Sequence, residues 1–458
     1  MLTLPRLLAL SFLARLPAVL WSRGYTFFDE QFQYLDPAYH LATGRPFLLT
    51  HEWIDGLRSW VYPGLLAGLL EAGDWLGLHG PEQQLIFVRL CLAVVSLLAV
   101  YGIYELVRAA GLERWQAPVA LLAANNGIVV YQGVHPNGPA LSCTLVLLAL
   151  GLVVRRGRTR AALAGLALGL AFCCRPQDGL FAGTLFVGML WMRRYADAFA
   201  LALGTSVMIL VQGVVDALTW GNFLHSTIAY VRFNLLYSSK WGGQSPWLYL
   251  GAIALVAPFA WTGLRMVLRG SRVLPLIACC ALVPLLVHQV LDRRAVRFVT
   301  PSLVLVTLLW ASGAAKLATQ RFKDASWTLR ASIVAGLVVH VVLFVVASIG
   351  YPSRHRIETA LYLGSVDDAK GIVYHDLSPI DSGGAFYYRG LAERHFVDRA
   401  DFAAFVTKRR DVSHVVARSG SDLEVPATIR LEALARFDAV WNPSGKHSYI
   451  VYRLQRRA

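Results

Sequence analysis

Two adjacent carboxylates, Asp29 and Glu30, follow directly after the first apolar segment of the chain. Ionised carboxylates next to a membrane are costly to desolvate, so a pair at such a place usually has a chemical task or a charged partner. A positioned carboxylate can take the proton of a hydroxyl group that attacks a substrate. Asp29 and Glu30 are therefore the first candidates for chemistry in this sequence.

The opposite charge is concentrated in the short polar stretch 291–301. It carries Arg293, Arg294 and Arg297. A guanidinium group matches the oxygens of a phosphate with two parallel hydrogen bonds, so the stretch predicts a lipid-phosphate contact by at least one of the three arginines. The alternative is that Arg293 and Arg294 pair with Asp292 or with lipid headgroups.

Other polar stretches leave alternatives open. Arg175 either pairs with Asp178 or reaches the same phosphate. Two further stretches combine aromatic rings with carboxylates, amides and an arginine, as sugar-binding sites do, but a belt of interfacial aromatic residues has the same composition. The two stretches are 36–59 and 216–247.

Several other kinds of site have no support. The histidines lack His-x-x-His spacing, so we predict no bound metal. Neither a Gly-x-Ser-x-Gly turn nor a Walker phosphate loop occurs, which leaves hydrolase and ATPase chemistry without a motif. The six cysteines are scattered or lie in apolar runs, as packing residues do.

Composition assigns the chain to the polytopic membrane proteins. Of its 458 residues, 56% are hydrophobic and 16% charged, and the mean hydropathy is +0.51. Soluble proteins carry roughly 25% charged residues. The formal net charge of +15 does not indicate a nucleic-acid partner, because the arginines mostly lie in short gaps between apolar runs, as in cytoplasmic loops.

About eleven apolar segments are predicted to cross the membrane as helices. They are 3–21, 85–107, 117–134, 139–154, 161–175, 179–192, 197–217, 247–268, 273–291, 296–314 and 331–350. Under this count the main basic gaps fall on one side, which makes that side cytoplasmic. The first segment is expected to remain as an uncleaved anchor. The apolar stretch 60–78 contains Pro63, Glu71 and Asp74, so we expect a partly embedded helix there.

Two larger regions then lie outside the cytoplasm, 22–84 and 351–458. The second has the composition of a soluble protein. Its patterns predict strands at 371–374, 412–417 and 447–454 and helices at 356–364 and 399–408. The predicted fold is an all-α polytopic membrane domain, residues 1–350, followed by a small extracytoplasmic α/β domain, residues 351–458.

The polar residues of the first loop resemble those of glycosyltransferase family 22, in the GT-C superfamily. That family has a Pro-Asp-Glu-Tyr-Trp/Phe-Gln motif followed by Ala-His. Here residues 28–33 read Phe-Asp-Glu-Gln-Phe-Gln, and Tyr-His follows at 39–40. The family's Thr-Trp-Glu-Trp/Phe, Ile-Arg-Ser and nearby proline correspond to Thr-His-Glu-Trp at 50–53, Leu-Arg-Ser at 57–59 and Pro63.

The later family motifs are kept in part, and the resemblance covers roughly residues 1–310. Its Asp, Tyr-Gly, Tyr-x-x-x-Asn, Tyr-Gly and Pro-Trp elements look like Asp216, Trp220-Gly221, Tyr230, Asn234, Trp241-Gly242 and Pro246-Trp247. Its His-Ser-Phe-x-x-His-Lys-Glu-x-Arg-Phe-x-x-Pro motif is matched at His288, Arg297, Phe298 and Pro301. The His-Lys-Glu triplet is replaced by Arg293-Arg294-Ala295, which keeps positive charge and loses a carboxylate.

The resemblance implies transfer of a sugar, mannose in this family, from a polyprenyl-phosphate donor to a hydroxyl of a glycan or glycolipid acceptor. The reaction would invert the anomeric centre, need no cofactor and take place outside the cytoplasm. Asp29 would be the base, and Glu30 would orient the acceptor or tune the base through its like charge. The donor phosphate would be held by Arg297 with Arg293, Arg294 and Arg58. Substrate binding would involve His40, Glu52, Trp53, Asp216, Tyr230, Asn234 and His288.

Two other classes stay open, a lipid-linked glycan flippase or transporter and an O-antigen ligase-like enzyme. A transporter would place charges in broken helices at mid-membrane, whereas here they cluster at predicted external ends. A ligase would centre on a large late external loop rather than on carboxylates after the first helix. Arg-, Ala- and Leu-rich usage favours a bacterial inner membrane with a periplasmic active site; in a eukaryote the same topology implies the endoplasmic reticulum.

Overall fold

The computed structural model describes residues 3–112, 115–237, 244–258, 273–291, 294–321, 327–443 and 447–456. They form two compact units, each described by itself. The helical unit comprises Met1–Ser22, His51–Leu65 and Leu85–Ile349, and the mixed unit comprises Arg23–Thr50, Leu66–Gln84 and Gly350–Ala458. The division at residue 350 into two sequence-defined domains stays a prediction.

Apolar helices build the helical unit, and α4 and α5 contribute residues to both units. In chain order they are α1 (Leu4–Trp21), α3 (His51–Ile54), α4 (Val61–Trp75), α5 (Pro81–Val95), α6 (Leu97–Ala109), α7 (Gln116–Ala124), α8 (Gly127–Val134), α9 (Gly138–Val154), α10 (Arg158–Cys174), α11 (Gly179–Trp191), α12 (Tyr195–Trp220), α13 (His225–Leu236), α14 (Leu248–Val256), α16 (Val273–Val290), α17 (Thr300–Arg321) and α18 (Trp327–Ile349). The short 3₁₀ turns η3 (Pro176–Asp178) and η5 (Val296–Val299) precede α11 and α17.

Within the described residues, five helices are long and apolar enough to cross a membrane, or six if the bent pair α7–α8 forms one span. The five are Leu4–Trp21, Pro81–Ala109, Tyr195–Trp220, Val296–Lys316 and Ile333–Gly364. Helices occupy the other predicted spans too, apart from the portion of 247–268 that lies outside the described residues. The total of about eleven crossings stays a prediction.

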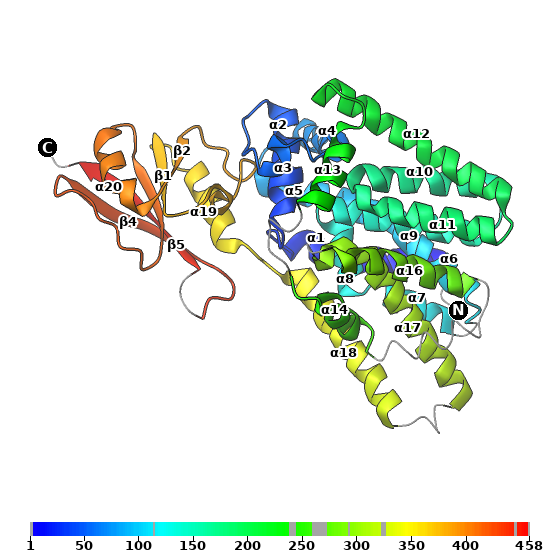
Figure 1. The fold of residues 1–458 in the computed structure, drawn as a ribbon. Helices are drawn as coiled ribbons and strands as arrows, with labels where there is room; N and C mark the ends of the chain where they lie inside the picture. The colour runs from blue at the N-terminus through cyan, green and yellow to red at the C-terminus, as the bar shows by residue number, and fades with distance from the viewer. Residues whose placement is uncertain are drawn as a thin grey trace. The chain divides into compact units, whose positions relative to one another are not determined.

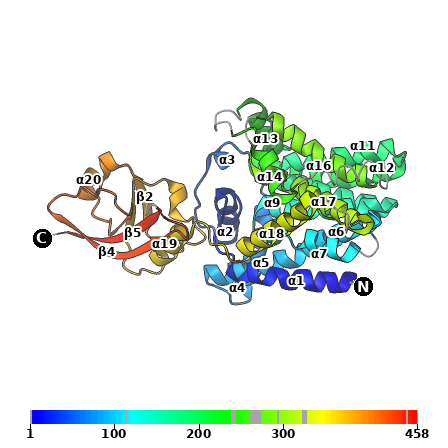
Figure 2. The ribbon, with the colours of Figure 1, turned by 90° about the horizontal axis from the view of Figure 1, so that it is seen from below.

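Small residues let neighbouring helices of this unit approach closely, as is common for helices surrounded by lipid. Helix α10 packs against α9 and α12 (Figure 1), and α16 packs against α17 (Figure 2). A Cβ atom on Gly165 of α10 would overlap the Leu201 carbonyl group of α12. Elsewhere α12 and α18 expose large apolar side chains such as Phe199 and Val341, as lipid-facing helices do.

The mixed unit contains a five-stranded sheet with the strand order β2-β1-β3-β5-β4. Strands β2 and β3 pair in parallel with β1, whereas β5 pairs antiparallel with β3 and β4. Its elements are the π-helix η1 (Glu30–Leu35), α2 (Asp36–Thr43), α19 (Arg354–Gly364), β1 (Gly371–His375), η6 (Pro379–Ser382), β2 (Glu393–Val397), α20 (Arg399–Lys408), β3 (His414–Arg418), β4 (Ile429–Asp438) and β5 (Ser448–Arg456).

Helices α20 and α19 cover opposite faces of this sheet. Phe402 of α20 belongs to a buried cluster with Val373 of β1 and Leu454 of β5. On the other face, the His355 ring of α19 lies edge-on to the Tyr449 ring of β5, with 4.7 Å between ring centroids. Tyr449 and Leu454 point to opposite faces because they are five positions apart along one strand. The predicted small α/β region is therefore confirmed, and β2 and β4 are additional to the predicted strands.

Buried neutral histidines make the mixed unit sensitive to acid. Burial, aided by Arg356 and His447, lowers the pKa of His355 to about 4, and burial also lowers the pKa values of His375 and His414. An unfolded histidine titrates near 6.5. These histidines therefore contribute fully to the free energy of unfolding above pH 6.5, and this contribution is lost as the pH falls towards 4.

We expect the full-length protein to show a lower unfolding temperature for this unit at pH 5 than at pH 7, by on the order of 5 °C for each kcal/mol lost. Calorimetry of His355→Phe should show a weaker pH dependence, whereas the exposed control His79→Phe should keep it. The raised pKa of Asp36 acts in the opposite direction, so the difference between variants is the informative quantity. An unchanged pH dependence in His355→Phe would contradict the assignment.

Candidate active site

The carboxylate pair lies at the start of the π-helix η1. Asp29 is its N-terminal cap residue and is partly exposed, whereas Glu30, its first residue, is only 3% exposed. Short π-helical turns are rare and frequently mark functional sites. Of the two acids, Asp29 is thus the one whose side chain is open to a substrate.

His40 lies in the last turn of α2, the helix that follows η1. Its Nδ1 lies 2.7 Å from the Arg45 carbonyl oxygen, and its ring packs on Phe47 with 5.2 Å between centroids. Gly44 ends α2 with a φ of 71°, a left-handed conformation that suits glycine. The structure therefore gives His40 a local role in the turn after α2.

An aromatic cluster surrounds the Glu52-Trp53 motif in the helical unit. Trp53 is 2% exposed and lies 4.3 Å from Trp60 and 6.2 Å from Trp220, between ring centroids. The Trp220 indole donates to the Arg58 carbonyl oxygen at 3.1 Å, and the Arg58 guanidinium lies 4.0 Å from Glu52. These predicted residues come together, and Arg58 has a carboxylate partner within the cluster.

Asp216 holds the start of α13. It is fully buried, and its Oδ2 accepts from the Ser226 backbone N–H at 2.9 Å and from the Ser226 hydroxyl at 2.6 Å. These two hydrogen bonds to Ser226 cap the first turn of α13. Asp216 thus orients the helix that carries Tyr230 and Asn234.

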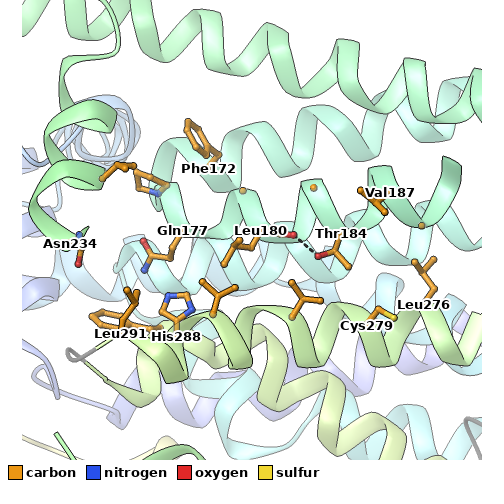
Figure 3. A pocket seen from close by; sticks show the side chains of 18 of the residues that line it. Phe172, Gln177, Leu180, Thr184, Val187, Asn234, Leu276, Cys279, His288 and Leu291 are labelled. Atoms are coloured by element: carbon orange, nitrogen blue, oxygen red, sulfur yellow. Dashed lines mark hydrogen bonds between the residues drawn. The ribbon is translucent and has the colours of Figure 1, made fainter. Parts of the chain in front are cut away.

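A cavity of about 890 Å³ runs between α10, α11, α13 and α16 (Figure 3). Polar side chains gather at one end, and aliphatic side chains such as Val187 and Leu276 line the other. The polar end is formed by Gln177, Tyr230, Asn234 and His288, and Thr184 lies farther along α11. Predicted residues from two separate stretches, Tyr230 and Asn234 on α13 and His288 on α16, therefore meet at one end of an apolar cavity, and Gln177 of η3 joins them there.

Arg175 connects this polar end to the predicted phosphate arginines. It is 3% exposed, its Nη1 donates to the Arg297 carbonyl oxygen at 2.6 Å, and both guanidinium groups lie over the Phe298 ring. The Gln177 amide is 2.6 Å from the Tyr230 hydroxyl, and with its oxygen turned to Arg175 it accepts from Nε at 3.1 Å. Sequence reasoning left Arg175 undecided and did not select Gln177.

The other two arginines of the 291–301 stretch differ from Arg297. The Arg294 guanidinium donates to the Gln289 carbonyl oxygen at 2.9 and 3.2 Å and to the Gln244 carbonyl oxygen at 2.9 Å, which caps the end of α16. Arg293 lies outside the described residues, as does the Trp241-Gly242 motif. Arg297 is therefore the described arginine of this stretch whose guanidinium lies over Phe298, a residue that lines the cavity.

A second cavity of about 680 Å³ lies beside α13 in the helical unit. Its lining mixes aromatic rings with charged and amide groups, a combination suited to sugar rings and their hydroxyls. The residues are Asp55, Leu57, Asn222, Phe223, His225, Ile228, Ala229, Arg232, Phe233 and Tyr237.

One group in the described chain has metal-like spacing. The ligand atoms of Glu393, His395 and Asp411 lie within 4.8 Å of one another. Arg409 bonds to Glu393 at 3.1 Å and to Asp411 at 2.7 Å, so a guanidinium already balances the two carboxylates. The group is better described as an ion-pair network than as a metal site.

Solved structures with a similar fold come from GT-C enzymes. ArnT from Cupriavidus metallidurans bound to undecaprenyl phosphate has a TM-score of 0.65 at 12% identity, over 98% of this chain and 97% of that chain. The oligosaccharyltransferase of Archaeoglobus fulgidus tethered with an acceptor peptide has a TM-score of 0.52 at 12% identity, over 90% and 68%. At such identities the likeness concerns the fold, and it supports the GT-C type predicted from sequence.

Curated relatives point to the same family. GPI mannosyltransferase 3 of Drosophila melanogaster is 25% identical over 344 residues, 71% of this chain and 59% of that protein. GPI mannosyltransferase 3 of Yarrowia lipolytica is 26% identical over 321 residues, 66% and 61%. The chain thus spans about three fifths of the length of these relatives. Residues 7–363 match the sequence profile of the Alg9-like mannosyltransferase family. The chain is an integral membrane protein that belongs to the Alg9-like mannosyltransferase family.

Proposed function

We propose that this protein transfers mannose from a polyprenyl-phosphate donor to a hydroxyl of a glycan or glycolipid acceptor. The observation that carries the proposal is the long apolar cavity with a polar, arginine-flanked end. Family membership favours a glycosyltransferase over a flippase, and the combination of apolar and anion-binding features favours a lipid-phosphate donor.

The apolar part of the cavity suits an isoprenoid chain. The cavity runs alongside α11, a helix of 13 residues and therefore about 20 Å long. Its aliphatic end reaches Trp191 and Met192, which adjoin the basic gap predicted to be cytoplasmic. Its polar end adjoins η3, on the side predicted to be external. An isoprenoid chain lying along this direction would bring its phosphate to the external side.

The polar end suits the phosphate and the departing oxygen. In our proposal the Arg297 guanidinium stabilises the charge that develops on the phosphate as the glycosidic bond breaks. Arg175 holds the Arg297 main chain, and His288 and Tyr230 border the space beside it. A phosphate is a good leaving group when paired with arginine, so no acid catalyst is required.

The acceptor side of the reaction needs a base. We assign that role to Asp29, which is partly exposed, and we assign to the buried Glu30 the role of its neighbour. The second cavity, with its aromatic rings and polar groups, is suited to acceptor sugars. A single displacement inverts the anomeric centre, so a β-linked donor gives an α-linked product.

The cellular setting completes the proposal. We infer about eleven membrane crossings, with the active site outside the cytoplasm, in the periplasm of a bacterium or in the lumen of the endoplasmic reticulum of a eukaryote. Nucleotide sugars are not present there, which is consistent with a lipid-linked donor and with a sequence that lacks a nucleotide motif.

Gly183 offers a direct test of the donor cavity. It lines the cavity, and a Cβ atom there would meet nothing within 4 Å. We expect Gly183→Trp to fill the cavity and weaken binding of labelled polyprenyl phosphate at least tenfold, about 1.4 kcal/mol. Gly183→Ala is the matched control and should bind nearly as the parent does. Equal binding by the Trp variant would contradict the donor site, provided that both variants are folded.

A further inference from the structure

Asp36 is a buried carboxylate that the proposed chemistry does not use. It is the first residue of α2 and is fully buried within the mixed unit. Its Oδ2 accepts from the Ala385 backbone N–H at 2.9 Å, and its Oδ1 accepts from the Phe386 backbone N–H at 2.8 Å and from Gln31 Nε2 at 2.6 Å. The segment that carries Asp29 is thereby joined to the loop that precedes β2.

The loop is shaped to receive a carboxylate. Gly383 and Gly384 have φ values of 75° and 88°, which allow successive backbone N–H groups to converge as an anion-binding concavity. A Cβ atom on Gly384 would lie 2.8 Å from Asp36 Oδ2, so a side chain there would displace the carboxylate. Burial raises the pKa of Asp36 to about 6, against the effect of its backbone donors and of Arg394.

The same carboxylate holds the π-helical turn. Gln31 and Asp36 are five residues apart, the spacing of a π-helical hydrogen bond. The Asp36 backbone N–H donates to the Gln31 carbonyl oxygen, and the Gln31 side chain donates back to the Asp36 carboxylate. If the turn relaxed to an α-helix, residues before it would rotate by about 100° about the helix axis. Asp29 and Glu30 lie at that end of the turn.

Other contacts fasten the segment on both sides of Asp36. The Arg356 guanidinium lies 4.9 Å from the centroid of the Phe28 ring and is itself held by Asp381 at 2.8 Å. Tyr39 lies edge-on to Phe386 at 5.7 Å between centroids. Phe28, directly before the carboxylate pair, and Tyr39 of α2 are therefore held by the C-terminal part of the mixed unit.

We propose that Asp36, together with the 383–386 loop, is a positioning latch that fixes the π-turn and thereby the orientation of the Asp29-Glu30 pair. On this view the C-terminal α/β region serves transfer by holding the first loop. The catalytic role of Asp29 in this proposal rests on the proposed function, whereas the contacts that form the latch do not depend on it. Asp36 is a positioning residue, since it acts through the backbone that carries Asp29.

The test combines hydrogen exchange with kinetics on the full-length protein in lipid nanodiscs. We expect Asp36→Ala to raise exchange roughly tenfold in peptides covering 27–43 and 379–390, while β3 and β5 stay protected. With labelled polyprenyl-phosphate mannose, kcat should fall about 100-fold and the donor KM should change little. Gly384→Ala should act in the same way, and Asp36→Asn, which keeps one acceptor oxygen, should be intermediate.

Two control variants isolate the latch. Asp74→Ala removes an exposed carboxylate of the same unit, and Gly420→Ala alters a glycine in the turn after β3 with a φ of 82° and no nearby atoms. Both should leave exchange in 27–43 as in the parent. Unchanged exchange in Asp36→Ala, or a rise spread evenly over the whole mixed unit, would overturn the latch. If Asp29→Asn proved fully active, the base assignment would fail while the exchange result would still decide the latch.

Discussion

We expect the Asp29→Asn variant to lose sugar transfer, by about 100- to 10,000-fold, the range typical of a missing general base. The amide keeps the size of the side chain but cannot take the acceptor proton. Donor binding should be unchanged, because in our proposal Asp29 acts on the acceptor. The measurement is initial-rate transfer from labelled polyprenyl-phosphate mannose, beside direct donor binding on the same preparation.

Two companion variants make this result specific. Glu30→Gln should lose less activity, because Glu30 is buried and serves as a neighbour of the base. Asp367→Asn, an exposed carboxylate of the mixed unit, should transfer at the parental rate. Full activity in Asp29→Asn, with loss in Glu30→Gln, would move the base to Glu30; full activity in both would remove the pair from the mechanism.

Arg297→Ala should weaken donor binding about 10- to 100-fold, the effect of losing a charge-assisted hydrogen bond worth roughly 1.5–3 kcal/mol. Arg297→Lys should recover part of the affinity, since an ammonium keeps the charge but not the two-pronged geometry. Binding of labelled polyprenyl phosphate measures the effect, and Arg156→Ala, an exposed arginine of a predicted cytoplasmic gap, is the control. Parental affinity in Arg297→Ala would exclude it from the phosphate site.

Much of the architecture follows from local sequence patterns. Apolar runs bounded by arginines predict the helices of the helical unit, because each run must satisfy its backbone internally in lipid. Strands β1, β3 and β5 are predicted by their buried β-branched and aromatic residues. Strand β4 is not, since Leu431, Glu432, Ala433 and Ala435 favour helix, and pairing with β5 overrides that preference.

The candidate site is predictable where chemistry requires rare residues in order. Asp29, Glu30 and Arg297 can be selected from charge and family motif alone, although their roles remain proposals. The latch could not be predicted, because Asp36 and Gly384 are 348 positions apart and meet only in the tertiary structure. A Gly-Gly pair predicts a turn, but the residues around it do not indicate which carboxylate the turn binds. The π-turn likewise depends on that tertiary contact.

The most direct test of the central claim is a transfer assay with purified protein in liposomes. Polyprenyl-phosphate mannose, GDP-mannose and polyprenyl-diphosphate sugars, each labelled in the sugar, are offered in parallel with a glycolipid acceptor fraction. Our account predicts that label leaves only the lipid monophosphate donor and appears in an α-linked mannosyl product, and that Asp29→Asn abolishes this. Transfer from the nucleotide or diphosphate donor, or movement of intact lipid-linked sugar across the bilayer without a new glycosidic bond, would contradict it.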